Sequence, residues 1–399
     1  MKLSLAANYD NDLVPQLSSY CVNEVYGKFP ADLAGGGRPS YMGTLLNRRD
    51  LARYVSTLNR HGIRFNYLLN ASCMGNKEWD KRWQKGLMSL LETLGQFGIQ
   101  ALTISTPFLL ELVKKRFPQF EVKVGIYAQV DTPRRAKFWE DLGADAINLE
   151  SFSVNRNFAL LSAMREAVQC DLQLIANHCC LPNCPLQPYH QNGFAHSSDG
   201  SKRLFVDYCF MRCTRLRLQD PSLFIKSQWI RPEDVSFYEK LGYSTFKLIE
   251  RGIPSEELLR RAKAYSERRY EGNLADLILP YGFKAAPRKR RFWTLRNFVR
   301  PFQANPLKLM TLHKVAQQQG MLFAQDSQPI HIDTAQIPPD FIDQFKSRDC
   351  SRLDCAQCRY CEEIAARAVR VEPEFRAESL RRFSDLDESL IGGGLWGIR

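Results

Sequence analysis

The sequence contains no apolar run long enough to cross a membrane. No stretch approaches the roughly 20 apolar residues that a spanning helix needs, and the opening MKLSLAANYD turns polar by Asn8 instead of continuing as the apolar core of a signal peptide. We therefore expect a cytoplasmic protein. Thiols stay reduced in that compartment, so the 12 cysteines of this 399-residue chain indicate metal binding and not a disulfide scaffold.

Two groups of common motifs are also missing. The sequence shows no Ser/His/Asp order and no HExxH, so it has neither a visible serine nucleophile nor the zinc-water site of a metalloprotease. The glycine-rich loop at residues 27–41 lacks the GxGxxG and GxxxxGK[ST] patterns of nucleotide-binding loops. Gly35, Gly36 and Gly37 could let this loop fold over a ligand with Arg38 contacting an anion, or they could form a flexible connector.

Lys and Arg outnumber Asp and Glu, which gives the chain a formal net charge of +12. A basic surface attracts phosphate and carboxylate groups, so an anionic partner is possible. Much of the excess lies in the run Pro287–Arg300, PRKRRFWTLRNFVR, whose interleaved aromatic residues are compatible with RNA binding. A solvated linker between two regions is the interpretation that we favour for this run.

Short apolar segments alternate with helical patterns through residues 1–273. We expect helices at 12–20, 47–61, 78–96, 107–116, 133–142, 155–169 and 232–241. The strands look apolar along their length, which is typical of a sheet covered by helices. Eight such units predict a (β/α)8 barrel resembling that of triose-phosphate isomerase; an open, doubly wound sheet is the alternative. The expected strands are Leu3–Asn8, Val22–Tyr26, Phe65–Asn70, Ala101–Ser105, Val122–Tyr127, Ala146–Glu150, Leu172–Asn177 and Phe246–Glu250.

A dense group of cysteines follows the seventh expected strand, in the loop 178–213. Cys179, Cys180 and Cys184 come first, and Cys209 and Cys213 follow a polar excursion at 186–203 that could act as a lid. The active site of such a barrel lies where its strands end. Strand ends also place Cys73, Glu150, Asn177, His178 and Glu250 at this mouth. The thiols predict a metal centre, and four thiolates suit either zinc or an iron–sulfur cluster.

Three of these residues are candidates for acid–base catalysis. His178 could donate a proton or bind metal, although a backbone carbonyl would satisfy a loop histidine equally well. Glu150 and Glu250 could bind substrate or orient ligands, and Glu250 could instead pair with Arg251.

A second cysteine group lies in the C-terminal part of the chain. We expect a linker at 274–306, a cysteine-rich region at 307–371 and a tail at 372–399. Cys350, Cys355, Cys358 and Cys361 have the spacing C-x4-C-x2-C-x2-C just before an expected helix at 362–369. This is a strong metal signal, with zinc and a second iron–sulfur cluster as the two interpretations.

The run NHCCLPNCPLQPYH, the later Cys209, and the segments IRPEDV (230–235) and FKLIERG (246–252) resemble the collagenase-like peptidases of unassigned type, family 32. The resemblance covers Leu3 to about Asn273. It implies a barrel that holds a four-iron, four-sulfur cluster on four cysteines, as in the members that hydroxylate ubiquinone, tRNA and ribosomal RNA without oxygen, some of them with prephenate as the oxygen donor.

Carried over to this chain, the resemblance implies Cys180, Cys184 and Cys209 as cluster ligands. Cys213, close in sequence, or Cys73, at the end of a strand, would be the fourth, and we favour Cys213. The C-x3-C spacing of the first two ligands is tighter than in the better-known members, so their exact ligand set does not transfer directly.

The leading hypothesis is therefore an iron–sulfur enzyme that performs oxygen-independent hydroxylation or a related redox modification. Its substrate would be an anionic small molecule, RNA or peptide held by Arg38, Arg231 or Arg251, with an electron donor or partner subunit assisting. The rivals are a metal-dependent peptidase and a zinc-stabilised protein that binds RNA or peptide.

Overall fold

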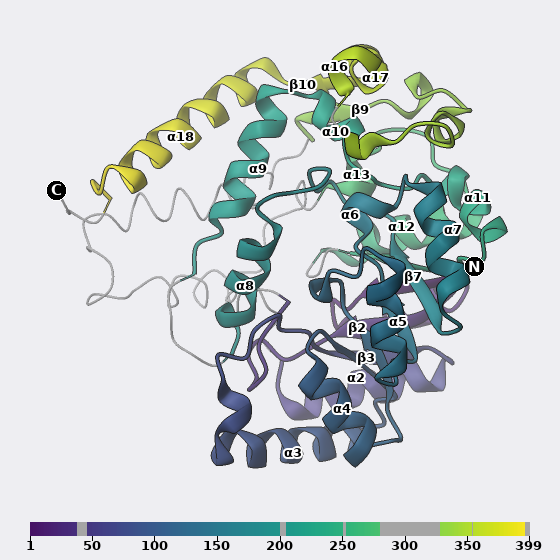
Figure 1. Ribbon diagram of the computed structural model, residues 1–399, viewed down its shortest axis with the longest axis vertical. Helices are drawn as coiled ribbons and strands as arrows, with labels where there is room; N and C mark the ends of the chain where they lie inside the picture. The colour runs from purple at the N-terminus through teal and green to yellow at the C-terminus, as the bar shows by residue number, and fades with distance from the viewer. Residues whose placement is uncertain (38–45, 200–204, 250–252, 280–327, 353, 396–399) are drawn as a thin grey trace.

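The computed structural model describes residues 1–37, 46–199, 205–249, 253–279, 328–352 and 354–395 (Figure 1). Eight parallel strands form a closed barrel in chain order. They are β1 (Lys2–Ala6), β2 (Val22–Gly27), β3 (Arg64–Leu69), β4 (Ala101–Ile104), β5 (Glu121–Val124), β6 (Ala146–Asn148), β7 (Asp171–Ile175) and β8 (Thr245–Leu248).

The first and last strands close the barrel. β1 pairs in parallel with both β2 and β8, and Ser4 lies opposite Glu24 on one side and Lys247 on the other. An open sheet would leave β1 or β8 at an edge. The closure confirms the expected barrel and excludes the doubly wound alternative.

Helices between the strands cover the barrel. Several begin at a side chain that accepts a hydrogen bond from the first turn, such as Asn47, Asp80 and Asn157. The described helices of this part are α1 (Val14–Leu17), α2 (Arg48–Arg60), α3 (Lys81–Gln96), α4 (Pro107–Arg116), α5 (Pro133–Asp141), α6 (Ser151–Val154), α7 (Phe158–Ala167), α8 (Gln187–Ser197), α9 (Tyr208–Gln219), α10 (Ser222–Lys226), α11 (Val235–Lys240), α12 (Ser255–Glu267) and α13 (Ala275–Ile278).

Two expected helices differ from those observed. The helix expected at 12–20 is only the single turn α1. The helix expected at 155–169 is divided into α6 and α7, because Asn155 is buried and its Nδ2 donates to the carbonyl oxygens of Ile175 and Gln228, both at 2.9 Å. This tie holds the chain against the barrel between the two helices, and Asn157 then starts α7.

The barrel interior is polar, which corrects the expectation of strands that are apolar along their length. Glu24 on β2 reaches Lys123 on β5, and since these strands are not neighbours the pair must cross the interior. Ser4 and Asn66 donate to Glu24 Oε1 at 2.7 and 3.2 Å. Alternate positions such as Leu3 and Val25 belong instead to the large hydrophobic cluster shared with the helices.

The C-terminal segment, the described residues from 328 to 371, packs onto the barrel. Its elements are β9 (Ile330–Ile332), η6 (Thr334–Gln336), η7 (Phe341–Phe345), η8 (Cys350–Arg352), α16 (Cys355–Cys358), α17 (Tyr360–Ala368) and β10 (Val369–Val371). β9 and β10 pair antiparallel, and α17 packs against α10 at the top of Figure 1. Ile330, Phe341 and Ile364 are buried in the same hydrophobic cluster as the barrel residues, so the segment shares the barrel's core.

The region expected as a tail contains the helix α18 (Pro373–Ile391), which buries Phe383 and Leu386. α18 lies along α9, where Arg212 and Arg215 both contact Asp387 (Figure 1).

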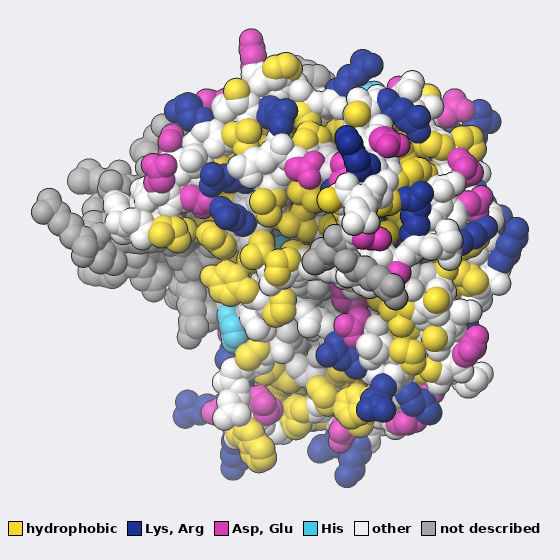
Figure 2. Space-filling view, turned by 45° about the horizontal axis from the view of Figure 1, so that its top comes forward, with side chains coloured by type: hydrophobic (Ala, Val, Ile, Leu, Met, Phe, Trp, Pro, Cys, Tyr) yellow, Lys and Arg dark blue, Asp and Glu magenta, His cyan; other side chains and the backbone are white. Residues whose placement is uncertain are grey.

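None of the described helices is both long and apolar enough to cross a membrane. Figure 2 shows Lys and Arg side chains interspersed with Asp and Glu over the face that it displays. Pro287–Arg300 lies outside the described residues.

Candidate functional site

The loop after β7 carries the first thiols. Asn177 fixes its start, because its side chain accepts from Ile249 N at 2.6 Å and donates to the carbonyls of Ile249 and Leu277. The loop then turns at Asn183, whose φ of 49° lies in the left-handed region that asparagine tolerates. Cys179 is buried, and Cys180 and Cys184 are partly buried.

The helix α9 presents the second pair of thiols. Asp207 caps it by accepting from Phe210 N at 2.9 Å, and its other oxygen lies 2.9 Å from His190 Nε2 on α8. Cys209 and Cys213 are four residues apart on α9, so they lie on the same face. The Asp207 cap thus fixes the start of α9, the helix that carries Cys209 and Cys213.

The four thiols expected to bind the barrel metal lie close enough to act on one another. Burial raises the pKa of Cys180 well above its usual value, and the thiols of Cys179, Cys213 and Cys184 raise it further. Burial also raises the pKa of Cys209 to about 12, with further contributions from Asp207, Cys213 and Cys184. The Cys213 charge thus influences the pKa values of both Cys180 and Cys209.

Cys73, the other candidate for the fourth ligand, has different surroundings. Its sulfur accepts from Gly75 N at 3.4 Å, and its neighbour Ser72 donates to Asn192 on α8. The Ser72 contact ties this part of the chain to α8, whereas the Cys213 charge raises the pKa values of Cys180 and Cys209 in addition to burial. The fourth ligand, Cys213 or Cys73, remains a prediction.

Arg217 is a member of the site that the sequence analysis missed. It is 1% exposed and donates to the carbonyl of Cys179 at 2.8 Å and to Cys213 Sγ at 3.4 Å. Burial raises the pKa of Cys213 to about 11, and the Arg217 charge opposes that rise. The only available signal was its position four residues after Cys213 on a helix.

Glu150 lies at the end of β6, beside the loop of thiols. Its carboxylate accepts from Gln187 Nε2 at 2.8 Å and from the hydroxyl of Ser153. Burial raises the pKa of Glu150, and these two hydrogen bonds oppose the rise. Burial raises the pKa of Cys184, and the Glu150 charge adds a smaller contribution to that rise.

His178 is buried and neutral. Its Nε2 lies 3.0 Å from the carbonyl of Ser151, and its ring packs edge-on against Phe152. Burial lowers the pKa of His178 to about 3, an effect that the Ser151 carbonyl opposes. This matches the interpretation of a loop histidine satisfied by the backbone, although Nδ1 is buried with no hydrogen-bond partner among the described residues.

Of the three arginines expected to bind substrate, the structure describes Arg231. Arg38 and Arg251, like Glu250, lie outside the described residues. Arg231 is buried, where it donates twice to Asp234 at 2.8 Å and also to the carbonyls of Pro338 and Pro339. In this structure Arg231 therefore joins the C-terminal segment to the barrel.

The glycine-rich loop passes over the end of β3. Gly36 has a φ of +88°, and a Cβ there would lie 2.5 Å from Ala71 N. Gly36 N also donates to Ala195 O on α8, and Ser198 donates to Gly36 O at 2.8 Å. Hydrogen bonds at Gly36 thus hold the glycine-rich loop against the end of α8. Only glycine permits such a close approach to the Ala71 backbone at position 36.

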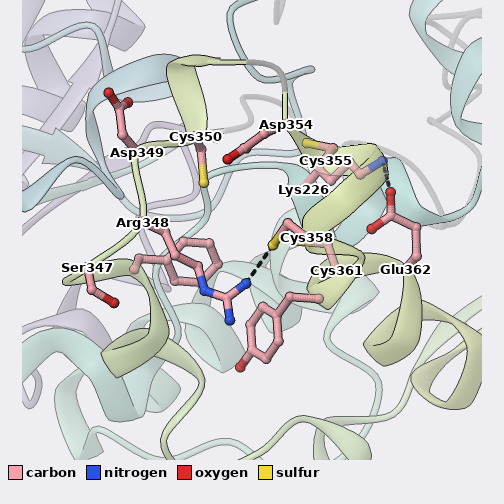
Figure 3. Close-up of a pocket in the computed structure, with 12 residues that line it drawn as sticks. Lys226, Ser347, Arg348, Asp349, Cys350, Asp354, Cys355, Cys358, Cys361 and Glu362 are labelled. Carbon is pink, nitrogen blue, oxygen red and sulfur yellow. Dashed lines mark hydrogen bonds and ion pairs between the residues drawn. The ribbon is translucent and has the colours of Figure 1, made fainter.

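The C-terminal cysteines line one cavity of about 410 Å³. Figure 3 shows that Arg348 bonds to Cys358 Sγ, at 2.5 Å, and that Lys226 pairs with Glu362 at 2.6 Å. Burial raises the pKa of Cys361 to about 11, opposed by the charge of the buried Arg156. The lining thiols are Cys350, Cys355, Cys358 and Cys361.

In neither group of four described cysteines are the Sγ atoms arranged as a complete set of metal ligands. Within the described ranges, no group of three or more His, Cys, Asp or Glu side chains could hold a metal ion as the side chains stand. A bound ion or cluster would therefore have to draw the Sγ atoms inward. The donor chemistry of both groups nevertheless fits a thiolate-bound metal, because each offers four sulfurs. The buried Arg217 contacts Cys213 in the first group. In the second, burial raises the pKa values of Cys350 and Cys361, and the charge of the buried Arg156 opposes that rise.

Comparison with known proteins places the chain in a family. The model of peptidase family U32 matches residues 41–172. A protein described as the uncharacterized protease MJ1657 of Methanocaldococcus jannaschii is 30% identical over 350 residues, which cover 88% of this chain and 89% of that protein. The chain belongs to peptidase family U32. The resemblance inferred from the cysteine loop is thereby confirmed.

Two solved structures are similar to this U32 chain at low sequence identity. The U32 peptidase Mk0906 is 19% identical, with a TM-score of 0.47, and the match covers 63% of this chain and 93% of that one. A 3-hexulose-6-phosphate synthase is 12% identical, with a TM-score of 0.36, and the match covers 68% of this chain and 100% of that one.

Proposed function

We propose that this U32 chain is an iron–sulfur enzyme that holds a four-iron, four-sulfur cluster on Cys180, Cys184, Cys209 and Cys213. Its reaction is an oxygen-independent hydroxylation or a related redox modification of an anionic small molecule, RNA or peptide. The observation that supports it is that the buried Arg217 bonds both to the Cys179 carbonyl in the β7 loop and to Cys213 Sγ on α9, which links the two segments that carry these thiols. A cytoplasmic location, where thiols stay reduced, suits such a site.

When bound, a cluster of this kind supplies a Lewis acid or an electron relay. The chain's own residues would provide the rest. Glu150, whose pKa is raised by burial, can hold or release a proton at its carboxylate beside the thiols. Gln187 and Ser153 orient that carboxylate through their hydrogen bonds.

Exclusion of water is the second contribution of the chain. The glycine-rich loop is bonded to α8 through Gly36, Ala195 and Ser198, and both elements belong to loops at the ends of strands. Covering the mouth in this way strengthens electrostatic interactions within it and protects reactive groups from solvent. A substrate would therefore enter by displacing one of these two elements.

The C-terminal thiols would hold a second centre, either an iron–sulfur cluster that passes electrons or a structural zinc ion. An iron–sulfur cluster there would receive electrons from a donor protein. Lys226 and Arg348 border the cavity, and their charges suit an anionic centre or an acidic partner surface.

Anaerobic purification followed by metal analysis and visible absorption spectroscopy tests the proposal. We expect a brown protein with about four to eight irons per chain, depending on the metal of the second centre. A colourless protein that carries only zinc would refute the iron–sulfur enzyme and favour a zinc-stabilised binding protein. The rival peptidase, which the relative's description suggests, predicts cleavage of unfolded collagen or casein by the metal-loaded chain.

A further inference from the structure

Arg156, in the turn after α6, is a buried cation with no carboxylate bound to it among the described residues. It is 3% exposed, and its terminal nitrogens donate to the carbonyls of Ile225 and Trp229 at 2.7 and 3.2 Å. Its Nε is buried without a hydrogen-bond partner among those residues. A guanidinium stays charged in proteins, and burying an unpaired charge costs several kcal/mol.

Aromatic rings surround this cation. The guanidinium carbon lies 4.6 Å from the ring centre of Trp229, 4.9 Å from that of Phe341 and 4.8 Å from that of Phe345. Phe341 and Phe345 belong to η7, so the contacts join the barrel to the C-terminal segment. A ring face contributes about 2 kcal/mol when it is desolvated. The rings thus offset only part of the burial and supply no counter-charge.

The groups able to supply that charge are the C-terminal thiols. Phe345, one of the rings against the guanidinium, also lines the cavity of the C-terminal cysteines. Burial lowers the pKa of Arg156, and the ionisable groups that oppose this are, in decreasing order, Cys361, Tyr238, Cys350 and Asp234. Asp234 is already paired with Arg231, and the hydroxyl of the buried Tyr238 donates to Asn155 O. Cys361 and Cys350 remain, and both line the cavity of four cysteines.

A thiol carries no charge, whereas four thiolates around a divalent ion carry a net charge of about −2. The same holds for four thiolates on an oxidised four-iron, four-sulfur core. Loading the cavity with metal therefore places negative charge next to Arg156. The ion pair so formed would be desolvated, which is the condition under which electrostatic attraction is strongest.

We propose that Arg156 is the charge-balancing partner of a four-thiolate metal centre at Cys350, Cys355, Cys358 and Cys361, and that metal binding thereby clamps the C-terminal segment onto the barrel. This inference rests on the second centre of the proposed function. It adds a positioning residue from the barrel, and it makes docking of the segment depend on metal.

Cobalt binding to the metal-free, full-length chain tests the inference. Co²⁺ is titrated under anaerobic conditions against a competing chelator, and the thiolate-to-cobalt charge-transfer band is followed. The band that is lost in Cys358→Ser belongs to the C-terminal centre. We expect Arg156→Met to weaken binding there by about tenfold or more, which corresponds to about 1.4 kcal/mol, and Arg156→Lys to restore most of the affinity because it keeps the charge.

Hydrogen exchange of residues 341–345 and 360–368 provides a second readout. In the wild type, Co²⁺ should increase the protection of these residues, and in Arg156→Met at the same Co²⁺ concentration the increase should be smaller. Arg165→Met is the matched control, because Arg165 also donates to backbone carbonyls, those of Val168 and Cys170. It should change neither the band nor the protection.

Equal cobalt affinity and equal protection in the wild type and Arg156→Met would overturn the role of Arg156 while leaving the metal centre in place. A wild-type chain with no band that depends on Cys358 would overturn the second centre itself, and the inference with it. If Arg156→Met does not fold, Arg156→Gln, which keeps donors for the two carbonyls but lacks the charge, replaces it with the same expected loss.

Discussion

Glu24 and Lys123 form an ion pair across the interior of the barrel, with Oε2 and Nζ 2.5 Å apart and both side chains buried. Ser4 and Asn66 satisfy the other carboxylate oxygen, and Thr103 donates to Asn66 at 2.9 Å. The pair therefore belongs to a network that links β1, β2, β3, β4 and β5. Lys247 adds a second ammonium group that acts on Glu24.

Neutralising Glu24 should destabilise the fold strongly. Glu24→Gln preserves the size of the side chain but leaves the buried Lys123 charge with only the partly exposed Glu121, 3.3 Å away, as a counter-charge, which costs about 3 kcal/mol of unfolding free energy. Urea unfolding at pH 7 measures this loss. Asp141→Asn is the control, because Asp141 pairs with Lys137 on the surface and its removal should change stability little. Equal effects of the two substitutions would contradict a structural role for the pair.

The stability from Glu24 should be lost in acid. Burial alone would raise the pKa of Glu24, but Lys123, the Ser4 hydroxyl and Lys247 together outweigh it, and the folded pKa lies below the unfolded value of 4.5. The stabilisation is therefore present above pH 4.5 and is lost as the pH falls through the folded pKa. Unfolding measured between pH 7 and pH 3 should show the gap between wild type and Glu24→Gln narrowing below about pH 4.5. A constant gap would disprove this origin.

The barrel thiols should hold metal independently of the C-terminal ones. Cys180→Ala should remove the iron of the barrel centre and its share of the visible absorption, while the metal bound through Cys358 remains. Cys170→Ala is the matched control: Cys170 is also a partly buried thiol of the barrel, but the groups that act on it are Glu140, Arg165 and Asp171. Loss of all metal from a folded Cys180→Ala chain would mean that the two groups form one centre.

The close approach of the glycine-rich loop to β3 predicts different costs for two glycines. Gly36→Ala and Gly62→Ala both place a Cβ at positive φ, which costs about 1–2 kcal/mol. At Gly36 the new Cβ would also meet Ala71 N at 2.5 Å, whereas Gly62 has open space around it. Gly36→Ala should therefore lose about 1–3 kcal/mol more on thermal or urea unfolding. Equal losses would place the loop away from β3.

Much of the barrel could be predicted because its signals are local. Each strand is a short apolar run, and Pro107 and Pro133 mark the starts of α4 and α5. The polar interior was harder to predict, because Glu24 and Lys123 lie 99 positions apart and each is the single charge of its expected strand, 22–26 or 122–127. Only closure of the barrel brings them together.

In the candidate site, too, some residues have a local signal in the sequence and others are recognised only in the folded structure. The thiols of each group are near neighbours in sequence, so their spacing alone indicated metal. Arg217 is four residues from Cys213 on one helix, which is a weak local signal. Arg156 gave no signal, because nearly two hundred residues separate it from the cysteines that it faces.

The sequence by itself determined the order of strands and helices, the two groups of thiols and the family, because these depend on periodicity and on residues close together in the chain. The tertiary structure decided that the sheet closes, that Arg217 contacts both the Cys179 carbonyl and Cys213 Sγ, and that Arg156 is buried among aromatic rings of the barrel and the C-terminal segment. Those features depend on contacts between residues far apart in the chain, and such contacts are specified by how the whole core packs and by no local pattern.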